Sequence, residues 1–112
     1  RPIGMNQGIQ HPLAKGWAQL EAANLMVMKA ATLFDKGEDC GVEANTGKYL
    51  AAEAAFEACH VAISTLGGMG YAQEYHVERY LRESLIPRTA PVSAHMILNF
   101  IAEKVLDLPK SY

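Results

Sequence analysis

The chain has 112 residues, which suits a single domain, and its half hydrophobic, one-fifth charged composition is typical of a folded globular protein rather than a disordered segment. Its formal net charge of -2 offers no basic surface for nucleic acid or for an anionic membrane. No apolar run is long enough for a membrane span, no signal peptide is recognised, and the two cysteines are too few for a disulfide framework, so we expect reduced thiols in a cytoplasm-like compartment.

The first predicted element is a long helix whose apolar stripe starts at Leu13. Apolar or small residues recur at alternating steps of four and three, which predicts a helix face packed against other helices. Asn24 is the one polar member; a buried Asn usually fixes helix register, and a functional role is the less favoured alternative. Gly37 and the acidic turn that follows it predict the end of this helix. The stripe consists of Leu13, Trp17, Leu20, Asn24, Val27, Ala31 and Phe34.

A second helix is predicted from about Val42 to Leu66. Its many alanines permit a neighbouring helix to approach closely, with Glu53 and Glu57 on a different face. Gly47 inside this helix should cost about 1 kcal/mol relative to alanine, which weakens the prediction for the first turns.

Two shorter helices follow. The first should run from about Glu74 to Leu85 and stop at Pro87, because proline cannot continue a helix and restricts the residue before it. The second should open near Pro91 and end before Pro109. No segment alternates with period two for long enough to form a strand. The predicted fold class is therefore all-α, an up-and-down helical bundle with short connections.

The cluster Gly67-Gly68-Met69-Gly70 lies between the second and third predicted helices. A dinucleotide-binding loop needs the spacing G-x-G-x-x-G directly after a strand, so that backbone amides meet a pyrophosphate at the next helix start. Here the glycines follow a helix and are spaced G-G-x-G. The pattern favours a helix C-cap and tight turn over a phosphate loop.

Glu57 and His60 form an E-x-x-H pair, which supplies two metal ligands from one helix face in di-iron bundles. Such a site needs a second E-x-x-H pair and two further carboxylates, and no second pair is found. His11, His76 and His95 have no partner at a convincing metal-ligand spacing. We therefore favour a surface or hydrogen-bonded His60 and predict no metal site.

Three segments resemble the C-terminal part of acyl-CoA dehydrogenases. The segment "LGGMGYAQEYHVERYLRE" is similar to the family's glycine-rich turn followed by an aromatic residue and an "ER-(Y/K)-x-R-(D/E)" helix. "RPIGMNQGIQHPLA" resembles the family's "FG-x-x-I-x-x-x-Q-x-x-x-x-x-LA" segment without its Phe-Gly, and "APVSAHMILNFIAEKVLDLPKSY" resembles the closing helix that starts with "EGTSEI". The three motifs occur in the family's order and spacing over nearly the whole chain.

The resemblance implies a flavoprotein that removes a proton from the α-carbon and a hydride from the β-carbon of an acyl-CoA thioester. FAD accepts the hydride, and the electrons pass to an electron-transfer flavoprotein. Residues 1–112 would be the C-terminal helical domain of a longer enzyme, lacking the first helix of the family's four-helix bundle. The resemblance also implies a homo-oligomer, and the mitochondrial matrix in place of the cytoplasm if the source is eukaryotic.

The resemblance also implies FAD contacts in this chain. Gln7 matches a family glutamine near the adenine side of the cofactor, beside Ile3 and Asn6, whereas the family's arginine would precede Arg1. Within the glycine turn, Gly68 matches the glycine that approaches the FAD of a neighbouring subunit. The implied FAD-binding residues are Ile3, Asn6, Gln7, Ser64, Gly67, Gly68, Ser93 and His95.

Three of these positions carry specific expectations. Ser64 replaces a family glutamine, which weakens one polar contact to FAD. Ser93 stands at the threonine of "EGTSEI", where its hydroxyl could bond FAD at a helix N-terminus. His95 occupies a position where Glu or Gln is common.

Pro91 stands where many family members have their catalytic glutamate, and proline has no carboxylate that could abstract a proton. The resemblance to isovaleryl-CoA dehydrogenase, which lacks the same glutamate, implies that the base lies on the preceding helix, before Arg1. We therefore expect no catalytic residue in this chain, and little FAD retention or activity from it alone. The alternative is a catalytically inactive helical module that associates with itself or with a partner.

Overall fold

The computed structural model describes residues 1–112 and contains helices and no strands, which confirms the all-α prediction. The α-helices are α1 (Gln7–Asp35), α2 (Gly41–Leu66), α3 (Val77–Ser84), α4 (Ile86–Thr89) and α5 (Ala94–Lys104). Three short 3₁₀ segments complete the chain: η1 (Ile3–Met5), η2 (Gly67–Tyr71) and η3 (Gln73–Tyr75). None of these helices combines the length and the apolar character that crossing a bilayer requires.

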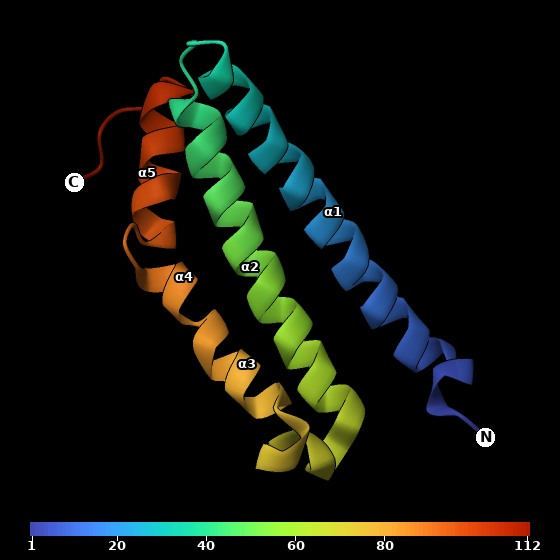
Figure 1. The fold of residues 1–112 in the computed structure, drawn as a ribbon. Helices are drawn as coiled ribbons and strands as arrows, with labels where there is room; N and C mark the ends of the chain where they lie inside the picture. The colour runs from blue at the N-terminus through green and yellow to red at the C-terminus, as the bar shows by residue number, and fades with distance from the viewer.

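The helices form three adjacent rows, which are α1, α2 and the run from α3 to α5, with α2 in the middle (Figure 1). α1 and α2 make a long antiparallel hairpin, and α3, α4 and α5 follow one another back along the other side of α2. The molecule measures 51 × 28 × 24 Å. Its radius of gyration is 17.0 Å, against about 13 Å for a compact domain of this length. The up-and-down bundle is therefore an elongated layer around α2 rather than a closed globule.

The turn between α1 and α2 ends both helices by hydrogen bonding. Gly37 adopts a positive φ of 72°, and its N–H donates to the Phe34 carbonyl at 2.9 Å. The Glu38 N–H donates to the Leu33 carbonyl, also at 2.9 Å, which completes a Schellman motif. On the other side, the Asp39 carboxylate accepts from the N–H of Gly41 at the start of α2. The predicted helix end at Gly37 is confirmed.

α1 starts at Gln7, six residues before the predicted apolar stripe, because Asn6 is extended and its carbonyl accepts from Ile9 and Gln10. The face that packs on α2 also differs from the prediction. It consists of Ile9, Pro12, Gly16, Ala23, Met26, Ala30 and Leu33, all buried or half-buried.

Most of the predicted apolar stripe lies outside this contact, although its member Val27 packs against Gly47 of α2. Trp17 is 66% exposed and Phe34 72% exposed, and Asn24 is also exposed. The physical reason is the size of the residues, because small side chains let two helix backbones come closer. At Gly47, a Cβ would lie 3.1 Å from Val27 Cγ2 and 3.3 Å from the Val27 backbone nitrogen. The glycine that weakened the prediction for α2 is therefore a point of close approach to α1.

The row from α3 to α5 is divided into more segments than predicted. His76 adopts a left-handed φ of 63°, so the expected continuous helix splits into η3 and α3. Pro87 lies inside the single turn of α4 instead of terminating a helix. Proline is tolerated there because N–H groups in the first turn have no acceptor within the helix. α5 begins at Ala94, three residues after Pro91, and ends at Lys104, five residues before Pro109, so it is shorter than predicted.

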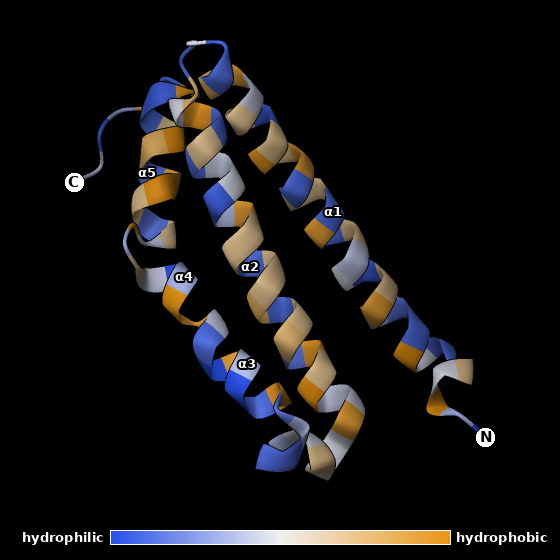
Figure 2. Ribbon diagram, viewed as in Figure 1, coloured by the Kyte–Doolittle hydropathy of each residue, from blue (hydrophilic) through white to orange (hydrophobic).

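The core of this chain is small. Nine residues are buried, and the hydrophobic ones are four alanines and Ile97, which is 1% exposed. Larger apolar residues occur along α1, α2 and the run from α3 to α5 (Figure 2), and many of them are exposed. The packing that positions the helices therefore relies on close approach of small residues around α2.

Candidate functional site

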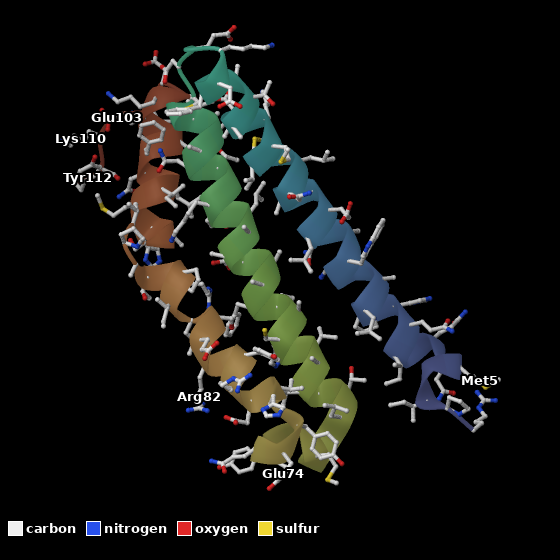
Figure 3. All side chains as sticks on the ribbon, viewed as in Figure 1. Met5, Glu74, Arg82, Glu103, Lys110 and Tyr112 are labelled. Atoms are coloured by element: carbon white, nitrogen blue, oxygen red, sulfur yellow. The ribbon has the colours of Figure 1, made fainter.

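The antiparallel hairpin brings two groups of predicted site residues to one end of the molecule. The first group, Ile3, Asn6 and Gln7, lies at or just before the start of α1, and the second group lies at the end of α2. In Figure 3, the labelled Met5 and Glu74 mark these two regions at the same end, opposite Glu103. The members from the end of α2 are Ser64, Gly67 and Gly68.

The start of α1 is fixed by local hydrogen bonds that leave Gln7 free. The Asn6 side chain donates to the Ile3 carbonyl at 3.1 Å and accepts from Arg1 at 2.8 Å. Gln10 donates to the Gly4 carbonyl at 2.8 Å. The Gln7 side chain is exposed and has no hydrogen bond to the rest of the chain. Asn6 therefore shapes the backbone, and Gln7 presents an unused amide to the surroundings.

The three glycines of the turn serve different purposes. Gly67 ends α2 with φ 61° and ψ -135°, a conformation that side chains rarely adopt. A Cβ on Gly70 would lie 2.6 Å from the Ile63 carbonyl oxygen and 2.9 Å from Ile63 Cα. A Cβ on Gly68 would meet no atom of this chain within 4 Å. The predicted C-cap and turn are confirmed, and Gly68 is the one glycine of the three that neither backbone conformation nor internal packing explains.

An open groove of about 640 Å³ lies between α1 and α2 near this end, and Ser64 is the one predicted site residue that lines it. Ile9 lines it from α1 and Ser64 from α2. His11, Glu57 and His60 line the same groove, so the E-x-x-H pair faces a histidine of the other helix. No three His, Cys, Asp or Glu side chains gather closely enough to hold a metal ion.

Ser93 and His95 lie elsewhere, at the start of α5. The Ser93 hydroxyl oxygen accepts from the Met96 N–H at 3.2 Å and caps the helix. The N–H groups of Ala94 and His95 have no acceptor in the chain. The Ser93 O–H hydrogen and two backbone N–H groups are thus available, and such donors suit phosphate oxygens.

Ser93 and His95 cannot form one compact site with the predicted residues at the other end of α2. The carbonyl of Val92, directly before Ser93, accepts a hydrogen bond from Lys48 of α2. Sixteen residues of helix separate Lys48 from Ser64, which corresponds to about 24 Å at 1.5 Å per residue. The structure therefore presents two separate half-sites.

Two side chains that the sequence did not single out hold the α4–α5 region onto α2. Lys48 donates to the carbonyls of both Pro87 and Val92. Arg88 forms a two-pronged ion pair with Glu53 at 3.0 and 3.3 Å, and its guanidinium lies 4.4 Å from the ring centre of Phe56. The sequence shows the charges, but their partners are 35 to 44 residues away, so no local pattern reveals them.

Comparison with known proteins identifies relatives over nearly the full chain. Residues 1–106 match the family model described as "Acyl-CoA dehydrogenase, C-terminal domain". The chain is 46% identical over 113 residues to acyl-CoA dehydrogenase FadE12 of Mycobacterium tuberculosis, covering 99% of this chain and 29% of that protein. It is 36% identical to the short/branched chain specific acyl-CoA dehydrogenase of rat mitochondria, covering 88% of this chain and 23% of that protein.

Among solved structures, the FAD complex of PigA has the same fold with a TM-score of 0.89. It is 27% identical, and the match covers 92% of this chain and 27% of that protein. The chain thus spans between a fifth and a third of the length of the proteins that it matches.

Proposed function

We propose, because the chain belongs to the family of acyl-CoA dehydrogenase C-terminal domains, that residues 1–112 are the C-terminal helical domain of a longer FAD-dependent enzyme. That enzyme would catalyse the α,β-dehydrogenation of an acyl-CoA thioester. The observation that carries this proposal is the family match over residues 1–106 together with 46% identity to an acyl-CoA dehydrogenase. The FAD complex of PigA supports the choice of cofactor.

The role of this domain would be to hold FAD through its two half-sites. Ser93 and the free amides that follow it have the donors that the phosphates of FAD require. Gly68 leaves space beside the backbone, and Gln7 offers an unused amide at the same end. Because about 24 Å of helix α2 separates Ser64 from Lys48, which binds the Val92 carbonyl next to Ser93, we assign the Gly68 end to the FAD of a neighbouring subunit and Ser93 to the chain's own FAD.

FAD, when bound, supplies the hydride acceptor for the reaction. The proton-abstracting base would come from a part of the enzyme outside residues 1–112, because Pro91 has no group that can take a proton. The remaining proposed partners are the acyl-CoA substrate and an electron-transfer flavoprotein. The bacterial relatives favour a cytoplasmic location.

The test is anaerobic titration of the full-length flavoprotein with acyl-CoA thioesters from short to long chain. We expect at least one of them to bleach the visible absorbance of the flavin, and coenzyme A without an acyl group to leave it unchanged. Flavin that no acyl-CoA reduces would refute the proposal. The 112-residue chain alone should lose flavin during gel filtration.

Self-association is a second proposed role, and the exposed apolar stripe of α1 favours it. Trp17 and Phe34 are more than half exposed in a chain with nine buried residues. Contiguous apolar surface of this kind marks protein interfaces. We expect sedimentation to show an oligomer, and the double variant Trp17→Gln, Phe34→Gln to shift the protein toward monomer. A wild-type monomer at high concentration would contradict this role.

A further inference from the structure

Lys48 holds the segment of chain that leads into α5. Its Nζ donates to the main-chain carbonyl oxygens of Pro87 and Val92, the second at 2.7 Å. No carboxylate lies within ion-pair distance of this ammonium group. Both bonds therefore act on the backbone of the α4–α5 region, and neither serves a charge pair.

The position of the two acceptors determines what Lys48 can control. Pro87 lies in α4, whereas the Val92 carbonyl belongs to the peptide unit whose nitrogen is that of Ser93. One ammonium thus joins both sides of the junction between α4 and α5. Fixing the Val92 peptide fixes the orientation of Ser93, and with it the cap and the free N–H groups that follow.

A second tie limits the movement of α4 but does not reach the Val92 peptide. Arg88 pairs with Glu53 through two bonds and stacks on Phe56, one to two helical turns beyond Lys48 on α2. These contacts anchor α4 when the Lys48 side chain is removed. Loss of Lys48 should consequently release the start of α5 while the rest of the layer stays in place.

We propose that Lys48 is a positioning residue for the half-site at Ser93. It acts through the Val92 peptide, and it orients the Ser93 hydroxyl and the N–H groups of Ala94 and His95 toward a phosphate of FAD. This role rests on the proposed function, which assigns FAD to that half-site. Lys48 is not a catalytic residue, since it touches only the backbone of its own chain.

The experiment compares full-length wild-type flavoprotein with Lys48→Met, which keeps the aliphatic side chain but removes all three donors. We expect the dissociation constant for FAD to rise about tenfold, because loss of charge-assisted hydrogen bonds of this kind has that order of effect. The visible circular dichroism of bound flavin should change, and hydrogen exchange at Met96 and Ile97, whose N–H groups donate to Ser93, should accelerate in the apoprotein. The matched control is Lys29→Met, which removes an exposed lysine of α1 that pairs with Glu43 at 3.6 Å and should change none of these readouts.

Each outcome decides between the roles. Wild-type FAD affinity and flavin dichroism in Lys48→Met, with only a lower melting temperature, would reduce Lys48 to a structural tie. If Lys48→Met yields no folded protein, Lys48→Arg takes its place; it retains the cation, and we expect folding with a smaller loss of FAD affinity than tenfold. A loss of FAD affinity of tenfold or more in Lys48→Arg, although the cation is retained, would also overturn the positioning role. A wild-type protein that binds no FAD would refute the proposed function, and the positioning role with it.

Discussion

The glycine turn after α2 and the junction between α4 and α5 are built in opposite ways. Backbone packing holds the turn, where Gly70 lies directly against Ile63 and Gly68 stays open. Long side chains hold the junction: Lys48 of α2 donates to the Val92 carbonyl, and Arg88 of α4 pairs with Glu53 of α2. A turn made by backbone packing tolerates no added atom at its contact point, whereas a junction tied by side chains should weaken in smaller steps.

The largest effect is expected from Gly70→Ala in the glycine turn. Its Cβ would lie 2.6 Å from the Ile63 carbonyl oxygen and 2.9 Å from Ile63 Cα, both backbone atoms that cannot move without shifting α2. We expect the free energy of unfolding to fall by roughly 3 kcal/mol, the upper range for overpacking. Urea titration followed by circular dichroism measures this change. A loss below about 1 kcal/mol would show that the turn is looser than its packing indicates.

The next largest effect is expected from Gly67→Ala, which tests conformation instead of space. No atom lies within 4 Å of the added Cβ, but φ 61° with ψ -135° is unfavourable for any side chain. Strain of this type costs roughly 1–3 kcal/mol, and we expect about 2 kcal/mol by the same titration. Equal stability of Gly67→Ala and wild type would mean that α2 can end in another conformation.

The same contrast explains what the sequence could predict. The end of α1 at Gly37 and the extent of α2 follow from periodicity and capping over a few neighbouring residues, so both were predicted. Most of the stripe from Leu13 to Phe34, which was predicted to pack against other helices, is exposed in this chain, because hydrophobicity favours large residues and close helix approach selects small ones. The roles of Gly47 and Lys48 depend on partners in other elements, and no local pattern contains that information.

At the junction, Ser93→Ala should cost about 1 kcal/mol, since it removes the cap that accepts from the Met96 N–H. Ser93→Asp separates this capping role from the proposed contact with FAD. The carboxylate can cap the helix, so stability should stay within about 0.5 kcal/mol of wild type, but its charge would repel a phosphate. We expect weaker FAD binding by full-length Ser93→Asp in a fluorescence titration. Unchanged FAD affinity would argue against a phosphate at this half-site.

Arg88→Met should cost somewhat less, about 0.5–1 kcal/mol, because the pair with Glu53 is about one-third exposed on each side. Methionine can still pack on Phe56, and so only the charge-dependent part is lost. High salt should reduce the difference between Arg88→Met and wild type in urea titrations. A difference that is independent of salt would assign the tie to packing instead of charge.

The smallest effect on stability is expected from Gly68→Ala, and this variant is the sharpest test of the turn. The added Cβ meets nothing within the chain, and Gly68 needs no positive φ, so the free energy of unfolding should change by less than about 0.5 kcal/mol. In the full-length enzyme, the methyl group would instead occupy the space proposed for a neighbouring subunit's FAD. We expect a higher dissociation constant for FAD in Gly68→Ala with an unchanged melting temperature of the apoprotein. If FAD affinity matches wild type, the open side of the turn faces solvent in the assembled protein, and the half-site at Ser93 alone would carry the contribution of this domain to FAD binding.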